Sequence, residues 1–249
     1  MRKATRQEVV VSDMRGRQGQ FKGFRSKAFR FLKEIRTHNE KAWFEAHRTD
    51  YERHLLEPLR DLVTDLTDFM LDIDLSFEVA PAVGKTISRI YRDTRFSKDK
   101  SPLRDCMWIT FKRSTKDWAR WCAGYFLEIN ATWYRYGLGF YDAAPDVMAQ
   151  FRAQLDDNPK RFLKAISWFD KQDIFTLEGE TYRRPKGADK PDPIRTWYNY
   201  KSFYLCCNHR NDRAIRSPQL VDDLKAAFGL TAPLYRYLLE TLTRVRPPR

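Results

Sequence analysis

The sequence predicts an α+β fold, a single domain with a mainly antiparallel sheet flanked by N-terminal and C-terminal helices. Apolar residues recur at helical spacing over 26–70, alternate with polar residues over much of 79–141, and return to helical spacing after Pro145. The 249 residues, 42% of them hydrophobic, are enough for a sizeable core. Surface scaling allows about 73% of the surface of the unfolded chain to be buried on folding.

The N-terminal part of the predicted domain is mainly helical. A first helix begins near Ser26, a residue type favoured as N-cap, and its apolar residues fall on one face. Asn39 is expected to cap a second helix, in which aromatic residues recur every four positions from Trp43. Pro58 suits the first turn of a third helix, because its missing N–H is not needed there.

The middle of the chain predicts the strands of the sheet. Apolar and polar residues alternate over 86–91, 107–112 and 125–129, and an aromatic strand follows over 133–141. The links between the last three strands are short. Because a parallel crossover needs a dozen or more residues, these strands are expected to be antiparallel neighbours.

Helices are expected again from Pro145 and from Pro159, each with an apolar face at helical spacing. A further strand is predicted over 175–182. Proline and lysine are frequent over 183–193, which indicates a loop between elements. These elements place a second group of helices after the main strands, as the predicted α+β arrangement requires.

Two separate helices are expected at the C-terminus. Ser217 and Pro218 match the preferred N-cap and first position of a helix, and Gly229 matches the residue that ends one. Thr231 and Pro233 are then expected to open the last helix, which turns a row of leucines inward. Proline is disfavoured inside a helix, which supports this division.

The chain is strongly basic. Its 46 Lys and Arg against 33 Asp and Glu give a formal net charge of +13, which favours an anionic partner such as nucleic acid or a phosphorylated ligand. Residues 1–20 are expected to be a basic flexible tail before a single α+β domain over 21–249. The sequence contains neither a membrane-length apolar run nor a secretory signal, so a cytoplasmic protein without a membrane partner is expected.

Several common catalytic and metal-binding patterns are missing from the sequence. The four cysteines lack zinc-finger spacing and are interpreted as reduced thiols, and neither a metal nor a cofactor is expected. Gly84-Lys85-Thr86 imitates the end of a P-loop, but Val79 stands where the first glycine is required. None of the four histidines lies in a recognisable nucleophile motif.

The densest charged segment of the chain is 89–100, in which cations are in excess. Guanidinium groups match the geometry of phosphate and carboxylate, so we expect the arginines here to contact an anion. Asp93 is expected to hold these arginines in place, with Lys100 and Lys201 as supports. The expected ligand-binding residues are Arg89, Arg92, Asp93, Arg95, Lys100 and Lys201.

The segment from Arg89 to Lys100, with its Arg-x-x-Arg-Asp-x-Arg-Phe pattern, resembles the signature of a bacterial domain-of-unknown-function family, the one numbered 2461. The resemblance covers nearly all of 21–245 and includes segments 21–24, 31–32, 39–51, 184–187 and 201–204. Leu103 stands where that family usually has an aromatic residue. The resemblance implies membership of the family, and it brings no established activity with it.

The leading hypothesis is a module that binds a phosphorylated or otherwise anionic ligand, including nucleic acid. A second is a metal-assisted phosphodiesterase or related hydrolase, in which Asp93 or Asp99 joins Glu128 around Mg²⁺ with Lys98 or Lys100 near the phosphate. A third is a structural protein whose ion pairs only join the sheet to a helix. The oligomeric state is not predicted.

Aromatic residues interleaved with cations over 108–135 allow one more hypothesis, single-strand binding by base stacking beside a cationic groove. The alternative is that the aromatic residues fill the core while the cations face water, as strand alternation favours. The aromatic residues concerned are Trp108, Trp118, Trp121, Trp133 and Tyr134. The cations among them are Lys112, Arg113, Lys116, Arg120 and Arg135.

Overall fold

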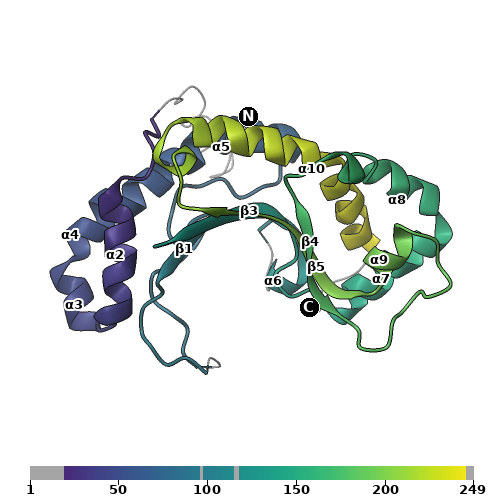
Figure 1. Ribbon diagram of the computed structural model, residues 1–249, viewed down its shortest axis with the longest axis horizontal. Helices are drawn as coiled ribbons and strands as arrows, with labels where there is room; N and C mark the ends of the chain where they lie inside the picture. The colour runs from purple at the N-terminus through teal and green to yellow at the C-terminus, as the bar shows by residue number, and fades with distance from the viewer. Residues whose placement is uncertain (1–19, 96–97, 115–117, 245–249) are drawn as a thin grey trace, which may run out of the picture. The chain divides into compact units, whose positions relative to one another are not determined.

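The structure is a computed structural model that describes residues 20–95, 98–114 and 118–244 (Figure 1). Of the expected tail at 1–20, only Gln20 is among the described residues. The chain forms two compact units, each described by itself below. The first unit is Met1–Phe111, Phe126–Arg135 and Asn208–Lys225, and the second is Lys112–Tyr125, Tyr136–Cys207 and Ala226–Arg249. The expectation of a single domain over 21–249 stays a prediction.

The described residues form an α+β fold around a five-stranded antiparallel sheet, as predicted. The order of the strands is β1-β2-β3-β5-β4, and β2, β3 and β5 contribute residues to both units. The strands are β1 (Cys106–Phe111), β2 (Gly124–Asn130), β3 (Trp133–Gly139), β4 (Thr176–Thr181) and β5 (Tyr200–Arg210). Strand β5 was not predicted, because the consecutive apolar run at 203–207 hides the alternation typical of a strand.

The prediction of a regular strand at 86–91 is wrong. This segment is extended beside β1, but it pairs only through isolated bridges, Ile87 with Ile109 and Tyr91 with Leu103. Backbone hydrogen bonds from Ser88 N to Trp108 O (2.9 Å) and from Thr110 N to Thr86 O (2.8 Å) hold it in place. The Arg-rich segment therefore begins on an irregular edge rather than at the end of a strand.

The N-terminal helices of the first unit follow the predicted order (Figure 1). Ser26 is the first residue of its helix rather than the N-cap, which is Arg25, and the Ser26 hydroxyl accepts a hydrogen bond from Arg216 Nη1 (3.0 Å). Helix α2 contacts α4 and the π-helix η1, and α5 contacts β1. The elements are α2 (Ser26–Thr37), α3 (Lys41–Ala46), α4 (Arg48–Tyr51), η1 (Glu52–Leu56) and α5 (Glu57–Ile73), with the 3₁₀ turn η3 (Ala214–Arg216) later in the chain.

The core of the first unit consists of apolar side chains from α2, α5 and the strands. Leu59, Leu62 and Leu66 form a fully buried stripe on α5, at the helical spacing seen in the sequence. Asp65, on the same helix, is also buried, and its carboxylate accepts the backbone N–H groups of Gln20 (3.3 Å) and Phe21 (3.0 Å). This buried carboxylate therefore fixes the start of the described chain to α5.

The core of the second unit is mainly aromatic. Phe151 on α7 packs edge-on against Phe162 on α8 (ring centroids 5.7 Å apart), and Trp197 on α9 packs against Phe203 on β5 (5.2 Å). Such edge-to-face pairs stabilise a core beyond the area that they bury. The helices are α6 (Trp118–Trp121), α7 (Pro145–Asp157), α8 (Pro159–Ala165), η2 (Phe169–Lys171) and α9 (Ile194–Tyr198), of which α6, η2 and α9 were not predicted.

The prediction of two C-terminal helices is wrong, because α10 (Gln219–Arg244) runs unbroken through Gly229 and Pro233. An interior proline costs about 3 kcal/mol and an interior glycine about 1 kcal/mol relative to alanine. Burying a large apolar side chain contributes about 1.5–3 kcal/mol. Phe228 and Leu234, on either side of the expected break, are both fully buried, so packing outweighs the local preference. Among the described residues, no helix has the length and apolar character needed to span a membrane.

Candidate functional site

A cleft of about 500 Å³ opens in the first unit beside the Arg-rich segment. Three of the side chains that line it are cations, and none is a carboxylate. Two of these cations come from the loop at 91–102, and the third lies at the start of α3. The lining residues are Lys41, Tyr91, Arg92, Thr94, Lys100 and Pro102.

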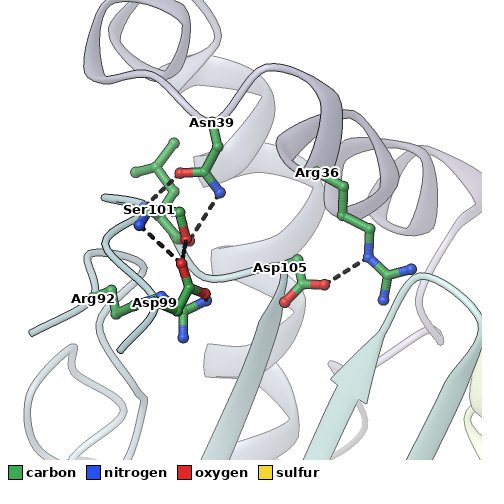
Figure 2. A network of polar contacts seen from close by, with 7 residues as sticks. Arg36, Asn39, Arg92, Asp99, Ser101 and Asp105 are labelled. Carbon is green, nitrogen blue, oxygen red and sulfur yellow. Dashed lines mark hydrogen bonds and ion pairs between the residues drawn. The ribbon is translucent and has the colours of Figure 1, made fainter. Parts of the chain in front are cut away.

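The loop at 91–102 is closed at its base by hydrogen bonds. Arg92 N donates to Pro102 O (2.8 Å), next to the bridge between Tyr91 and Leu103. The side chain of Asn39 then holds Leu103 from the other side: its Nδ2 donates to the Leu103 carbonyl (3.0 Å), and its Oδ1 accepts the Leu103 N–H (2.8 Å). Figure 2 shows Asn39 reaching toward the segment that carries Ser101.

The role predicted for Asn39 is therefore wrong. The N-cap of α3 is Glu40, whose side chain makes no capping bond, and Asn39 instead acts as the hydrogen-bonding partner of a distant chain segment. An amide side chain can bond both the N–H and the carbonyl of Leu103, because it carries a donor and an acceptor, as the backbone itself does. Leu103 is fully buried at this clamp.

Arg92 is the most enclosed cation of the cleft, with 21% of its side chain exposed. Its Nη2 lies 3.1 Å from Asp99 Oδ2 (Figure 2). Its Nε is buried and has no hydrogen-bond partner among the residues that the structure describes. Asp99 also accepts the N–H and the hydroxyl of Ser101 (2.9 and 2.7 Å); these bonds, and then the charge of Arg92, lower the pKa of Asp99.

The two lysines of the cleft are less engaged. Lys100 Nζ donates to the Thr94 carbonyl (2.8 Å), which leaves further N–H groups on an exposed ammonium. Lys41 is exposed and makes no ion pair within the described part of the chain.

A carboxylate near the rim of the cleft, that of Glu45, is already engaged. Tyr91 donates to Glu45 Oε1 (2.8 Å), and hydrogen bonds from Arg48 and then Tyr91 lower the pKa of Glu45. This nearby carboxylate is therefore already held by two partners.

Only part of the predicted site lines the cleft. Arg92 and Lys100 do, but Arg95 forms a separate, exposed pair with Asp93 (2.7 Å). The hydrogen bonds from Arg95 lower the pKa of Asp93 to about 2. Asp93 thus holds Arg95, whereas Asp99 holds Arg92.

The other two predicted residues lie outside the cleft lining as well. Arg89 is exposed and lies over Gly84, where an added Cβ would come within 3.4 Å of its Nε. Lys201 belongs to the second unit and pairs there with Glu180. Sequence reasoning missed Lys41, Tyr91 and Thr94; the proximity of Tyr91 and Thr94 to Arg92 was the only signal for them.

The carboxylates required by the metal-hydrolase hypothesis are engaged elsewhere. That hypothesis needed β2 beside the 86–91 segment, but β1 lies between them. Glu128 pairs with Arg135 (2.7 Å), and Asp93 and Asp99 pair with arginines of their own loop. Within the described ranges, no group of three His, Cys, Asp or Glu side chains is placed to hold a metal ion.

The aromatic residues between the cations fall into two classes. Tyr134 is buried and stacks on His209 (centroids 4.7 Å apart), as the core interpretation predicts. Trp108 and Trp133 are half-buried beneath the guanidinium groups of Arg104 (4.9 Å) and Arg135 (5.5 Å). Their faces are therefore partly covered by protein cations. The side chains of Lys116 and Trp118 lie outside the described residues.

A family comparison agrees with the resemblance seen in the sequence. The model of the family described as "Conserved hypothetical protein (DUF2461)" matches residues 27–237, which is most of the chain. The chain belongs to this family. The DUF2461 match spans the cleft, the Asn39 clamp and all five strands. No curated protein matches the chain.

Proposed function

We propose that the protein binds a phosphorylated ligand, with its phosphate group seated in the cleft between Arg92, Lys41 and Lys100. The observation that carries the proposal is the lining of the cleft, to which Arg92, Lys41 and Lys100 all contribute. A phosphate oxygen is a strong acceptor for the outer N–H groups of a guanidinium and for an ammonium.

The charge of the lining supports an anion rather than a neutral ligand. Three cations and no carboxylate face the cleft. Phosphate carries close to two negative charges at pH 7 and three acceptor oxygens, which two or three cations can bind together. Asp99 holds Arg92 from one side and so fixes the direction of its guanidinium.

The ion pairs of the loop supply little of the stability that the structural hypothesis requires. The Arg95–Asp93 pair is 77% and 53% exposed, and Asp99 of the other pair is 54% exposed. Ion pairs of this kind contribute about 0–1 kcal/mol. Both also join residues of the same loop. Arg36 with Asp105 (2.6 Å) does link a helix to the start of β1, but it too lies near the surface (Figure 2). This pairing is better suited to orienting cations than to holding the fold.

Calorimetric titration of the full chain with inorganic phosphate and pyrophosphate tests the proposal. Arg92→Ala is expected to weaken binding at least about tenfold, because hydrogen bonds to charged groups contribute about 1.5–3 kcal/mol. Lys100→Ala should weaken it less. Lys98→Ala is the matched control: it removes the same charge from the same loop at a residue outside the cleft lining.

The outcomes separate binding from a structural role. Arg92→Ala should leave the midpoint of thermal unfolding almost unchanged, since its partner Asp99 is half-exposed. If Arg92→Ala lowers stability by several kcal/mol without changing affinity, the residue is structural and the proposal is wrong. Equal losses of affinity in Lys98→Ala and Lys100→Ala would show that binding depends only on the net charge of the protein.

The finer proposal, a nucleic acid as the phosphorylated ligand, rests on the net charge of +13. Binding of a single-stranded oligonucleotide should fall steeply between low and moderate salt, because each neutralised phosphate releases counterions. Arg92→Ala should weaken that binding and make its salt dependence less steep. Absence of binding at both salt concentrations would exclude nucleic acid while leaving small phosphorylated ligands.

A further inference from the structure

A second cluster of cations, in the second unit, surrounds one aromatic ring. Lys186 Nζ lies 4.2 Å from the centroid of the Tyr182 ring, Lys201 Nζ 5.7 Å, and Arg152 Cζ 5.6 Å. A ring has only two faces, so at least two of these cations share one. Attraction to the ring quadrupole offsets part of the repulsion between these cations. The ring has no net charge, however, so it does not neutralise their positive charge.

Arg152 is the centre of this cluster. It lies on α7, and only 8% of its surface is exposed. Its Nη1 donates to the Tyr200 carbonyl (3.2 Å), and its guanidinium also lies 6.0 Å from the ring of Tyr198. No carboxylate of the described residues lies within ion-pair distance of it. Because a buried charge is costly unless it is paired, this site favours an anion from outside the chain.

The carboxylates around the cluster are paired with lysines other than Lys186. Asp156 accepts from Lys190 Nζ (2.8 Å) and from the Tyr198 hydroxyl (2.9 Å), and the hydrogen bonds from Lys190 and then Tyr198 lower the pKa of Asp156. Asp189 lies farther from Lys190 (3.6 Å), and Glu180 pairs with Lys201. Of the cations around Tyr182, Arg152 and Lys186 are therefore the two that make no ion pair with a carboxylate of the described residues.

The loop that carries Lys186 is held in place. The Lys186 N–H donates to Asn199 Oδ1 (3.0 Å). Gly187 has a positive φ of 71°, and a Cβ there would lie 2.7 Å from the Tyr198 ring, so the backbone packs directly on that ring. The segments 184–187 and 201–204, both part of the family resemblance, thus meet at Tyr182.

We propose that Arg152 and Lys186, beside the ring of Tyr182, form a second phosphate-binding site, separate from the cleft at Arg92. The planar guanidinium can donate two hydrogen bonds to one phosphate, and the ammonium binds it as a point charge. The two unpaired cations match the charge of about −2 on a phosphate group at pH 7. Lys201, already paired with Glu180, supports the site by its charge.

The experiment uses the Arg92→Ala chain, so that the cleft at Arg92 no longer contributes. Calorimetric titration with pyrophosphate is expected to show remaining binding, which Lys186→Ala should weaken at least about tenfold. Lys186 is exposed and makes no ion pair in the described ranges, so this variant should fold. Lys160→Ala, at another exposed lysine of the second unit, is the matched control and should change nothing.

Arg152→Lys provides a second readout. It keeps the charge but removes the guanidinium fork and its hydrogen bond to the Tyr200 carbonyl, so both the affinity and the unfolding midpoint should fall. If Arg92→Ala abolishes all pyrophosphate binding, the second site is wrong and the cleft proposal stands. If binding survives Arg92→Ala unchanged from wild type and is lost in Lys186→Ala, the cleft proposal fails and the second site stands. Equal effects of Lys160→Ala and Lys186→Ala would overturn the second site.

Discussion

The two cationic regions of this protein are built in opposite ways. In the cleft of the first unit, Arg92 and Lys100 come from one short loop, and the carboxylate that holds Arg92 is in the same loop. In the second unit, Arg152, Lys186 and Lys201 come from a helix, a loop and a strand and meet at the Tyr182 ring. The first region is mostly a local charge pattern, to which α3 adds Lys41, whereas every cation of the second is brought in by tertiary packing.

The difference shows what each region depends on. Local ion pairs orient side chains but add little stability when they are exposed, so the cleft depends on its backbone anchor at Asn39. The Tyr182 cluster has a buried arginine, so its stability and its affinity for anions are coupled. Substitutions should therefore separate folding from binding in the cleft more cleanly than in the cluster.

The largest effect is expected from Asn39→Ala. It removes both hydrogen bonds to the Leu103 backbone and leaves that backbone without its side-chain partner, at a cost of about 1–3 kcal/mol in the free energy of unfolding. Urea unfolding measures this. Asn39→Asp keeps the acceptor for the Leu103 N–H and should lose less. A wild-type unfolding curve for Asn39→Ala would show that the loop needs no anchor.

A smaller effect is expected from Tyr182→Leu, which removes the ring beneath three cations. The lost cation–π attraction, about 0.5–1 kcal/mol for an exposed cation, should lower the free energy of unfolding by about 1 kcal/mol. Tyr182→Phe keeps the ring and serves as the control, with a change below about 0.5 kcal/mol. Thermal unfolding compares the two. An equal loss in both would mean that the ring face is not what holds the cluster.

Asp99→Asn should increase the affinity of the cleft for phosphate. Asp99 competes for the guanidinium of Arg92, and because Asp99 is exposed the pair is weak, so the increase should be at most about fivefold. Asp93→Asn is the control, because Asp93 pairs with Arg95 outside the cleft lining. Titration with inorganic phosphate gives the comparison. Weaker binding in Asp99→Asn would instead show that the carboxylate positions Arg92 more than it competes.

The smallest effect concerns the exposed pair of Asp93 and Arg95. Hydrogen bonds from Arg95 lower the pKa of Asp93 to about 2 in the folded protein. The contribution of this pair is therefore present above pH 3.8 and is lost as the pH falls through about 2. Carboxyl-detected NMR titration should show Asp93 ionised at pH 3. Arg95→Gln should return its pKa toward the ordinary value, and an unchanged titration would contradict the pairing.

The reactivity of the Cys106 thiol tests the structure at a residue outside both cationic regions. Burial, and then the nearby Glu128 carboxylate, raise the pKa of its thiol to about 12. At pH 8 this thiol should react with iodoacetamide far more slowly than in the unfolded chain, because only the thiolate is the nucleophile. Mass-spectrometric mapping of the alkylated cysteines measures the rate. Rapid labelling of native Cys106 would show that this end of β1 opens.

The sequence by itself determined the elements whose pattern is local and regular. The stripe on α5 and the alternation in β1, β2 and β3 placed those elements correctly, because burial of one face imposes a period that a short window reveals. The sequence also identified the Arg-rich loop and two residues of the cleft, Arg92 and Lys100. It missed β5, in which both faces of the 203–207 stretch are apolar, and it divided α10 at Pro233, where packing outweighs propensity.

Only the tertiary structure decided which charges meet. Asn39 and Leu103 are 64 positions apart, and Lys41 reaches the cleft from a helix far from Lys100 in the sequence. Arg152 and Tyr182 likewise come together from different elements of the second unit. Contacts of this kind form when hydrophobic burial brings together segments that are far apart in the sequence. A local pattern of charges does not indicate which distant segments will meet.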